Sequence, residues 1–259
     1  GTFPQHSSGR LVFEDAAGII RRDLDLATMG GALRIEGGLA RMTDALAEGL
    51  PEILHLNHSV RRLIEDNSGV KLSGDSFDLR ASRAVLALPP RLMAGLGVAV
   101  PDVPTWMAGH TKLIATYARP FWRDAGLNGD AISHRGPLAE IHDASHAEAL
   151  EGALFSFAFP GAAWQSDFRE AALAQLARLL GPDAAAPRAL IIKDWSKDPE
   201  TATEVDRAPP AGHPAYRPFP STERLVFAGT ETAAGEGGFL EGALEAAEAA
   251  HFELSRIVV

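Results

Sequence analysis

The sequence predicts an α+β fold, in which a mixed β-sheet is combined with a few amphipathic helices. Three observations favour this class: short β-prone runs bounded by turn residues, stretches with apolar residues at helical spacing, and an order that is neither a regular β–α alternation nor a repeat. The chain has 259 residues, of which 46% are hydrophobic and 22% charged. This composition is typical of one large or two modest globular domains.

The first part of the chain predicts one helix and a series of strands. A strand is expected at residues 10–13, and a helix at residues 39–50, where apolar residues recur three and four positions apart. Four β-prone runs separated by turns that contain Gly, Asn and Asp then predict a meander, at residues 53–64, 70–72, 77–79 and 84–88.

The second part predicts four more strands and two helices. The strands are expected at residues 112–117, 154–159, 190–195 and 225–228, with a loop-rich stretch between the first two. Ser166 and Asp167 predict the cap of a helix that runs to about Leu180. A loop with five prolines covers residues 207–220, and the last helix is expected at roughly residues 239–254.

Composition and charge exclude several classes of function. Lys and Arg number 24 and Asp and Glu 34, so the formal charge is −10, and such a surface repels nucleic acid and anionic lipid. The absence of cysteine excludes disulfides, thiolate metal sites and a cysteine nucleophile. Because no apolar run is long enough to span a bilayer and no signal peptide is recognisable, we expect a cytoplasmic protein with neither a membrane nor a nucleic-acid partner.

The most informative segment is residues 224–250, RLVFAGTETAAGEGGFLEGALEAAEAA. A buried strand ends at Gly229, a loop of small residues follows, and a helix begins after Gly237 and Gly238. Two glycines allow a ligand to approach the backbone, and the N–H groups of Phe239 and Leu240 at the helix start favour an anionic or electron-rich ligand. The alternative is a tight strand-to-helix connection in which the glycines serve packing only.

This segment resembles the C-terminal flavin-binding segment of the FAD-dependent amine oxidases, and its sequence is most similar to that of the monoamine oxidases. The resemblance covers about residues 30–255. Further matching motifs follow in the family's order, namely R-I-E-G-G at 34–38, Val60, A-V-L-A-L-P-P at 84–90, Lys112, R-P-F-W at 119–122 and D-W at 194–195. The resemblance implies oxidation of a small-molecule amine or amino acid to the imine, with O2 reduced to H2O2.

The resemblance also implies roles for individual residues. The backbone at Val60 would contact the adenine end of FAD, and Gly229 and Thr230 the ribityl and pyrophosphate region. The amides of Gly238, Phe239 and Leu240 would face the N1/O2 edge of the flavin ring, where donors stabilise the charge of the reduced form.

Three residues are expected to be catalytic by the same resemblance. Lys112 would hold a water against flavin N5 and assist the reaction with O2, whereas a lysine in this position is otherwise an ordinary exposed strand end. Trp195 would pack near the flavin ring, or else be a simple core aromatic. Phe239 stands where the monoamine oxidases carry one of two tyrosines that flank the amine.

Other positions depart from the monoamine oxidases. Val205 matches the second tyrosine, so half of the aromatic pair is missing. The residue that carries a covalent flavin matches Glu204, and since the chain has no cysteine we expect FAD to be bound non-covalently.

Two further patterns are assigned no chemistry. His142 and His146 have the spacing of a helical metal pair, but no third ligand stands out, so no metal site is expected. Glu241, Glu245 and Glu248 have the spacing of a solvated helix face.

The sequence contains no G-x-G-x-x-G motif: Gly95-Leu96-Gly97 and Gly235-Glu236-Gly237 both lack the third glycine. We therefore expect a mixed β-sheet substrate domain packed on a partial FAD-binding, Rossmann-like domain, in a truncated or split chain whose missing motif comes from an N-terminal segment or another chain. The expected parts are a fragmentary segment at 1–38, an FAD-domain helix and meander at 39–91, a substrate domain at 92–190, and a return to the FAD-binding domain at 191–259.

Two other functions remain open. One is a flavin-dependent desaturase or porphyrinogen-type oxidase. Lys112 and the A-G-T-E-T motif argue against this alternative. The other is a non-catalytic remnant that has lost FAD and acts as an interaction module.

Overall fold

The computed structural model describes residues 2–4, 9–24, 33–50, 52–146, 150–208 and 210–256. The chain forms two compact units: unit 1 comprises Gly1–Ile53 and His110–Trp195, and unit 2 comprises Leu54–Gly109 and Ser196–Val259. The chain therefore passes between the units three times, each time further along than the boundaries expected after residues 38, 91 and 190. Which unit serves substrate and which serves cofactor stays a prediction.

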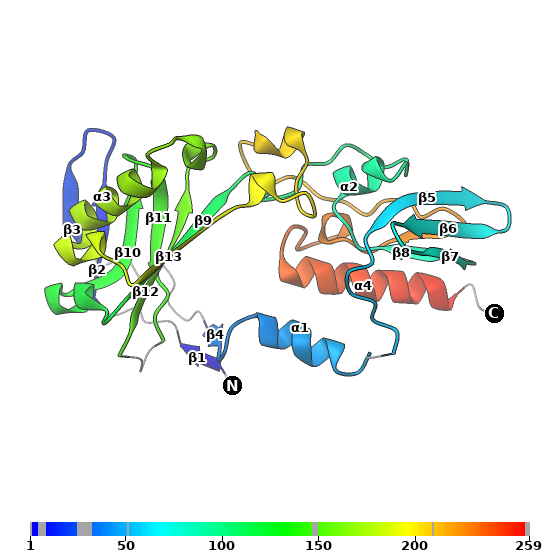
Figure 1. Ribbon diagram of the computed structural model, residues 1–259, viewed down its shortest axis with the longest axis horizontal. Helices are drawn as coiled ribbons and strands as arrows, with labels where there is room; N and C mark the ends of the chain where they lie inside the picture. The colour runs from blue at the N-terminus through cyan, green and yellow to red at the C-terminus, as the bar shows by residue number, and fades with distance from the viewer. Residues whose placement is uncertain are drawn as a thin grey trace. The chain divides into compact units, whose positions relative to one another are not determined.

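Unit 1 is built on a seven-stranded mixed sheet (Figure 1). All neighbouring strands are antiparallel except β10 and β2, which are parallel. The strand order is β13 (Ala189–Asp194), β9 (Thr111–Tyr117), β12 (Gly152–Ala158), β11 (Leu138–Asp143), β10 (Leu127–Ser133), β2 (Arg10–Glu14) and β3 (Ile20–Leu24).

The two faces of this sheet differ. Helix α3 (Phe168–Leu180) packs on one face (Figure 1), where Leu154 and Leu176 belong to the apolar core of the unit. On the other face, which we call the open face, the alternate residues Phe155 and Phe157 of β12 are only half-buried. Because successive side chains of a strand point to opposite faces, this alternation directs one set into the core and leaves the other set available.

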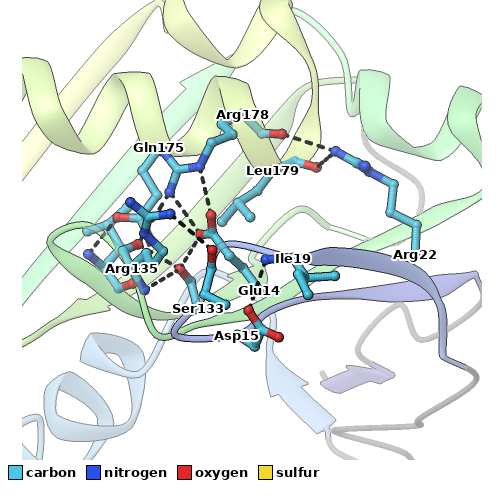
Figure 2. A network of polar contacts seen from close by, with 11 residues as sticks. Glu14, Asp15, Ile19, Arg22, Ser133, Arg135, Gln175, Arg178 and Leu179 are labelled. Carbon is cyan, nitrogen blue, oxygen red and sulfur yellow. Dashed lines mark hydrogen bonds and ion pairs between the residues drawn. The ribbon is translucent and has the colours of Figure 1, made fainter.

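A buried carboxylate joins the sheet to α3. Glu14 on β2 accepts hydrogen bonds from Arg178 at 2.9 and 2.8 Å and from the Ser133 hydroxyl at 2.7 Å. Figure 2 shows Arg178 reaching Glu14 from α3, and Arg22 donating to the carbonyl oxygens of Arg178 and Leu179 at the end of that helix. These bonds pair a charge that burial alone would make unfavourable.

The remaining elements of unit 1 lie outside the large sheet. Strands β1 (Thr2–Pro4) and β4 (Leu33–Ile35) form an antiparallel pair. Helix α1 (Ala40–Ala47) buries none of its residues. Short 3-10 turns are found at η1 (Phe121–Ala125), η2 (Ala162–Trp164) and η3 (Pro182–Ala185), and η1 places the fully buried Trp122 in the core.

Unit 2 combines a meander with a parallel strand pair. Strands β5 (Val60–Asp66), β6 (Gly69–Gly74) and β7 (Asp78–Ala81) are antiparallel neighbours, whereas β8 (Ala84–Leu86) pairs in parallel with β14 (Leu225–Phe227). The helices are α2 (Pro90–Gly95) and α4 (Leu240–Ser255), with 3-10 turns η4 (Trp195–Lys197, at the boundary with unit 1), η5 (Glu204–Arg207) and η6 (Thr230–Thr232). The apolar core includes Leu63, Met93 and Phe227.

The predicted fold class is confirmed, but several element predictions are wrong. Strand β8 leaves the expected four-run meander, and the run expected from residue 53 becomes a strand only at Val60. The stretch expected to be loop-rich contains β10 and β11. Asp167 takes the N-cap position of α3 without a side-chain capping bond. In the described part of the chain, no helix is long and apolar enough to cross a membrane.

Candidate functional site

The start of α4 in unit 2 is held by one hydroxyl group. Strand β14 ends at Phe227, and Thr230 follows in η6. The Oγ1 atom of Thr230 accepts the N–H of Gly238 at 2.9 Å and donates to the carbonyl of Phe239 at 2.8 Å. The loop after β14 is therefore tied directly to the first turn of α4, and Thr230 lies beside Gly238.

Only part of the expected set of free amides is present at this helix start. The N–H of Phe239 donates to the carbonyl of Glu236 at 3.2 Å, so the expectation of an unpaired amide is wrong for Phe239, and Thr230 takes the amide of Gly238. The N–H of Leu240 has no hydrogen-bond partner among the described residues. Of the three expected amides, that of Leu240, at the positive end of a 16-residue helix, thus remains without a partner among the described residues.

The two glycines before α4 are enclosed by aromatic side chains. Gly238 has a φ of +85°, and an added Cβ would lie 3.1 Å from atoms of Trp106, His213 and Tyr216. At Gly237 an added Cβ would lie 2.7 Å from Tyr216. The glycines therefore serve packing and backbone conformation here, whereas the close approach of a ligand stays a prediction.

The aromatic residues around these glycines form a cluster of their own. The rings of His213 and Phe239 are stacked, with centroids 5.3 Å apart and an interplanar angle of 2°, and Trp106 meets His213 edge-on at 4.9 Å. The Nε2 atom of His213 lies 2.8 Å from the carbonyl oxygen of Gly237. Phe239 thus has an aromatic partner, but the partner is His213 and not position 205.

Positions 204 and 205 lie in η5 and face solvent. The Val205 side chain is exposed, as is that of Glu204, which forms a surface ion pair with Arg207. Val60 opens β5, where it pairs with Gly74 in the register of the meander. Val60 belongs to the same unit as Gly229, Thr230 and the start of α4.

A buried acid that was not predicted from the sequence lies beside this helix start. The side chain of Glu231 in η6 is 3% exposed, and burial raises the pKa of its carboxyl group. Glu231 follows the carboxyl end of β14, and ligands of open α/β sheets bind outside this end of the strands. Glu231 stands two positions after Gly229, which follows a buried strand, and this position in the sequence is the signal that could have identified it.

Lys112 lies within β9 on the open face of unit 1. Its Nζ atom stands 5.4 Å from the ring centroid of Phe157 and 5.9 Å from that of Phe155. The register places Phe157 directly opposite Lys112 on the neighbouring strand. Lys112 is therefore half-buried over two phenyl rings, and the interpretation as an exposed strand end does not apply.

Trp195 follows β13 and belongs to the same unit as Lys112. Its backbone N–H donates to the carbonyl of His110 at 3.1 Å, and the Nζ atom of Lys193 lies 4.7 Å from the centroid of the indole ring. The indole is half-buried. The structure therefore places two lysine–aromatic contacts on adjacent strands, since Lys193 pairs with Lys112 in register.

A cavity of about 690 Å³ opens on unit 1. Its wall combines apolar and charged side chains, contributed by Leu11, Arg34, Asp130, Ala131, Ile132, Glu140, Ile141, His142, Phe155 and Phe157. His142 lies 3.4 Å from a carboxylate oxygen of Asp130 and 3.5 Å from one of Glu140. The adjacent Asp130 raises the pKa of His142 against the opposing effect of burial.

His142 is not part of a helical metal pair. It lies in strand β11, which ends at Asp143, so His142 and His146 are not placed one turn apart on a helix. In the described part of the chain, no group of three or more His, Asp or Glu side chains is placed to hold a metal ion.

Comparison with known proteins defines the class. The model of the family described as flavin-containing amine oxidoreductase matches residues 7–250. The chain therefore belongs to this family, as the resemblance of segment 224–250 predicts. The structures of engineered putrescine oxidase include one that aligns with 99% of this chain and 83% of its own, with a TM-score of 0.78 and 20% identity, which confirms the fold.

Curated relatives have higher sequence identity to this chain than that structure has. The chain is 30% identical over 241 residues to a probable flavin-containing monoamine oxidase A of Dictyostelium discoideum, covering 83% of this chain and 52% of the relative. It is 27% identical over 261 residues to a putative flavin-containing monoamine oxidase of Mycobacterium tuberculosis, covering 94% and 57%. Wild-type putrescine oxidase bound to putrescine aligns at 25% identity and a TM-score of 0.69, covering 86% and 54%. The chain thus spans about half the length of the curated relatives it matches.

Proposed function

We propose that this chain takes part in the oxidation of an amine or amino acid to the imine by non-covalently bound FAD, with O2 reduced to H2O2. The observation that carries the proposal is the start of α4, where a positive-φ glycine, a free Leu240 amide and the carboxyl end of β14 meet. When bound, FAD would take a hydride equivalent from the substrate carbon as the nitrogen loses a proton, and O2 would then take the two electrons and two protons to give H2O2. The imine is then hydrolysed by water.

The residues of unit 2 fit the edge of a flavin. The Leu240 amide and the α4 dipole suit N1/O2, where negative charge collects in the reduced ring, and Gly238 and Phe239 shape the adjacent backbone. Gly229, the backbone of Thr230 and the buried Glu231 suit the ribityl and pyrophosphate region, and the backbone at Val60 suits the adenine end. The hydroxyl of Thr230 already serves Gly238 and Phe239, so we assign no ligand contact to it.

The residues of unit 1 fit substrate binding and the reaction with O2. Lys112 supplies a positive charge on an open, partly aromatic face, and such a charge would stabilise superoxide as it forms. Trp195 would pack against the flavin ring. In unit 2, Phe239 would form one aromatic wall beside the amine.

The non-covalent mode of binding rests on the exposed Glu204 and the absence of cysteine. Because the sequence has no G-x-G-x-x-G motif, we expect residues outside these 259 to hold the pyrophosphate. We call the chain together with FAD and whatever residues complete this site the holoenzyme. A cytoplasmic location stays a prediction from the sequence.

Two measurements on the holoenzyme test the proposal. An absorbance spectrum should show a flavin band, and its absence would favour the interaction-module alternative. Peroxide release, measured with a panel of amines and amino acids, should exceed that of a boiled control. A flavin that no amine or amino acid reduces would contradict the proposal and favour a desaturase-type reaction at C–C bonds.

A further inference from the structure

Arg34 carries a buried hydrogen-bond donor without a partner. It lies on β4 and lines the cavity of unit 1. One Nη atom donates to the carbonyl of Asp143 at 3.0 Å, but the Nε–H is buried and has no hydrogen-bond partner among the described residues. Since buried donors in folded proteins are almost always satisfied, Arg34 has hydrogen-bonding capacity that the described residues leave unused.

Arg34 also makes no ion pair with the described residues, unlike the other charged side chains of the cavity. His142 stands between the carboxylates of Asp130 and Glu140. Asp130 in turn accepts a hydrogen bond from Asn128. Arg34 contacts a backbone carbonyl only, and no carboxylate of the described residues lies within ion-pairing distance of it.

The rest of the cavity wall suits an apolar group. The rings of Phe155 and Phe157 meet edge to face with centroids 4.7 Å apart, and Leu11, Ile132 and Ile141 complete the apolar part. The volume of about 690 Å³ lies in the range of small-molecule sites. The cavity therefore offers an unpaired guanidinium beside an aromatic surface.

We propose that Arg34 binds the carboxylate of the substrate, and that the substrates are amino acids whose apolar or aromatic side chain lies against Phe155 and Phe157. This inference rests on the proposed function for the reaction itself, and it selects amino acids over simple amines. A guanidinium binds a carboxylate through charge-assisted, geometrically matched hydrogen bonds, and the guanidinium of Arg34 has only a backbone carbonyl as its partner among the described residues.

A binding experiment tests the carboxylate site without requiring turnover. Benzoate and its neutral isostere benzamide are titrated into the holoenzyme by isothermal titration calorimetry. We expect benzoate to bind at least tenfold more tightly than benzamide, and Arg34→Met to weaken benzoate at least tenfold while changing benzamide less than twofold. Arg188→Met removes an exposed arginine of the same unit and should change neither affinity.

The benzamide affinity and the melting temperature of Arg34→Met show whether this variant is folded, so that loss of folding is not mistaken for loss of the carboxylate site. Equal affinity for benzoate and benzamide, or benzoate binding unchanged in Arg34→Met, would overturn the inference. If Arg34→Met does not fold, Arg34→Gln keeps a neutral donor at the position and is measured in the same way.

A kinetic comparison distinguishes this inference from the proposed function. Phenylalanine and phenethylamine, which differ by the carboxylate, are tested for anaerobic flavin reduction. We expect Arg34→Met to lower kcat/KM for phenylalanine at least tenfold and leave phenethylamine within twofold. Reduction by phenethylamine but not by phenylalanine would overturn the inference and keep the proposed function. Reduction by neither, nor by any other amine or amino acid, would overturn the proposed function, while the benzoate titration still decides the role of Arg34.

Discussion

Lys112 is a residue whose charge the local structure holds in a defined place. Its ammonium group lies over the rings of Phe155 and Phe157, whose faces attract a cation. We predict that Lys112→Met in the holoenzyme leaves anaerobic flavin reduction largely intact and slows reoxidation by O2 about a hundredfold, or about 3 kcal/mol, as for the loss of one preorganised electrostatic contact. Stopped-flow absorbance separates the two half-reactions.

The neighbouring strand provides the control for this experiment. Lys193 pairs with Lys112 in register and also lies over an aromatic ring, that of Trp195. Lys193→Met should leave reoxidation unchanged. The same slowing in both variants would show a general field effect, and unchanged reoxidation in Lys112→Met would return this lysine to a structural role.

Glu14 shows the opposite use of charge, because all its contacts are internal. Its carboxylate is 2% exposed and accepts two bonds from Arg178 and one from Ser133. We predict that Glu14→Gln lowers the free energy of unfolding by about 2 kcal/mol, since it leaves a charged partner without its counter-ion. Urea denaturation measures this. Glu151→Gln, which removes the partner of Arg188 in an exposed pair, should cost less than about 1 kcal/mol.

The same residue predicts a pH dependence of stability. Hydrogen bonds from Arg178 and Ser133 hold the pKa of Glu14 below its ordinary value. A group with a lowered pKa stabilises the folded state above its unfolded pKa, and the contribution is lost as the pH falls through the folded pKa. We therefore predict that the free energy of unfolding falls from about pH 5 downward, and that Glu14→Gln shows a shallower fall in the same urea series. Parallel curves for the two proteins would contradict this.

The glycines before α4 have a packing role in the structure and a ligand-facing role in the proposed function. We predict that Gly238→Ala releases the flavin, since the new Cβ enters the space among Trp106, His213 and Tyr216 at a φ of +85°. Gly97 has a φ of +88° with no atom within 4 Å of an added Cβ, so Gly97→Ala reproduces the backbone strain alone. Both variants should lose about 1 kcal/mol of stability.

Flavin content, measured by absorbance after gel filtration, distinguishes the two variants. Gly97→Ala should keep its flavin and Gly238→Ala should lose most of it. Retention in both would indicate that Gly238 serves only the conformation of the chain.

Elements were predictable where one face is apolar. The alternation around Phe155 and Phe157 predicts β12, and the spacing of Phe168, Ala172 and Leu176 predicts α3. Strand β10 was not predicted because its buried side chains include Asn128 and Asp130, which form a hydrogen bond with each other. A buried polar pair has the same sequence pattern as a loop, and only the tertiary structure shows that the pair is satisfied.

The site was predictable to the extent that it depends on backbone and sequence motif. The glycines and the helix start at residues 237–240 are where the sequence places them. The internal bond of the Phe239 amide, the burial of Glu231 and the orphan donor of Arg34 are not visible in the sequence. Each depends on which groups the folded chain brings close together, and neither spacing nor residue type indicates that.

Over the whole chain, the contacts that we propose with FAD are divided unequally. The chain provides a free amide at the start of α4 and the groups after β14 for the flavin end. Among the described strands, β14 pairs only with β8, and no G-x-G-x-x-G turn occurs in the sequence. The pyrophosphate, which carries the negative charge of the cofactor, therefore lacks the glycine-rich turn and helix N-terminus that bind it in dinucleotide folds.

We predict that protein consisting of only these 259 residues binds FAD weakly or not at all, because the remaining contacts reach mainly the uncharged ring. Protein whose mass shows only these residues is incubated with FAD, separated by gel filtration and examined for flavin absorbance. Riboflavin, which lacks the pyrophosphate and the adenosine, is the matched ligand: its affinity for the chain should be similar to that of FAD, because the pyrophosphate lacks its glycine-rich turn and the adenine end gains only the backbone at Val60. Stoichiometric FAD, or a clear preference for FAD over riboflavin, would show that this chain binds the pyrophosphate by other means.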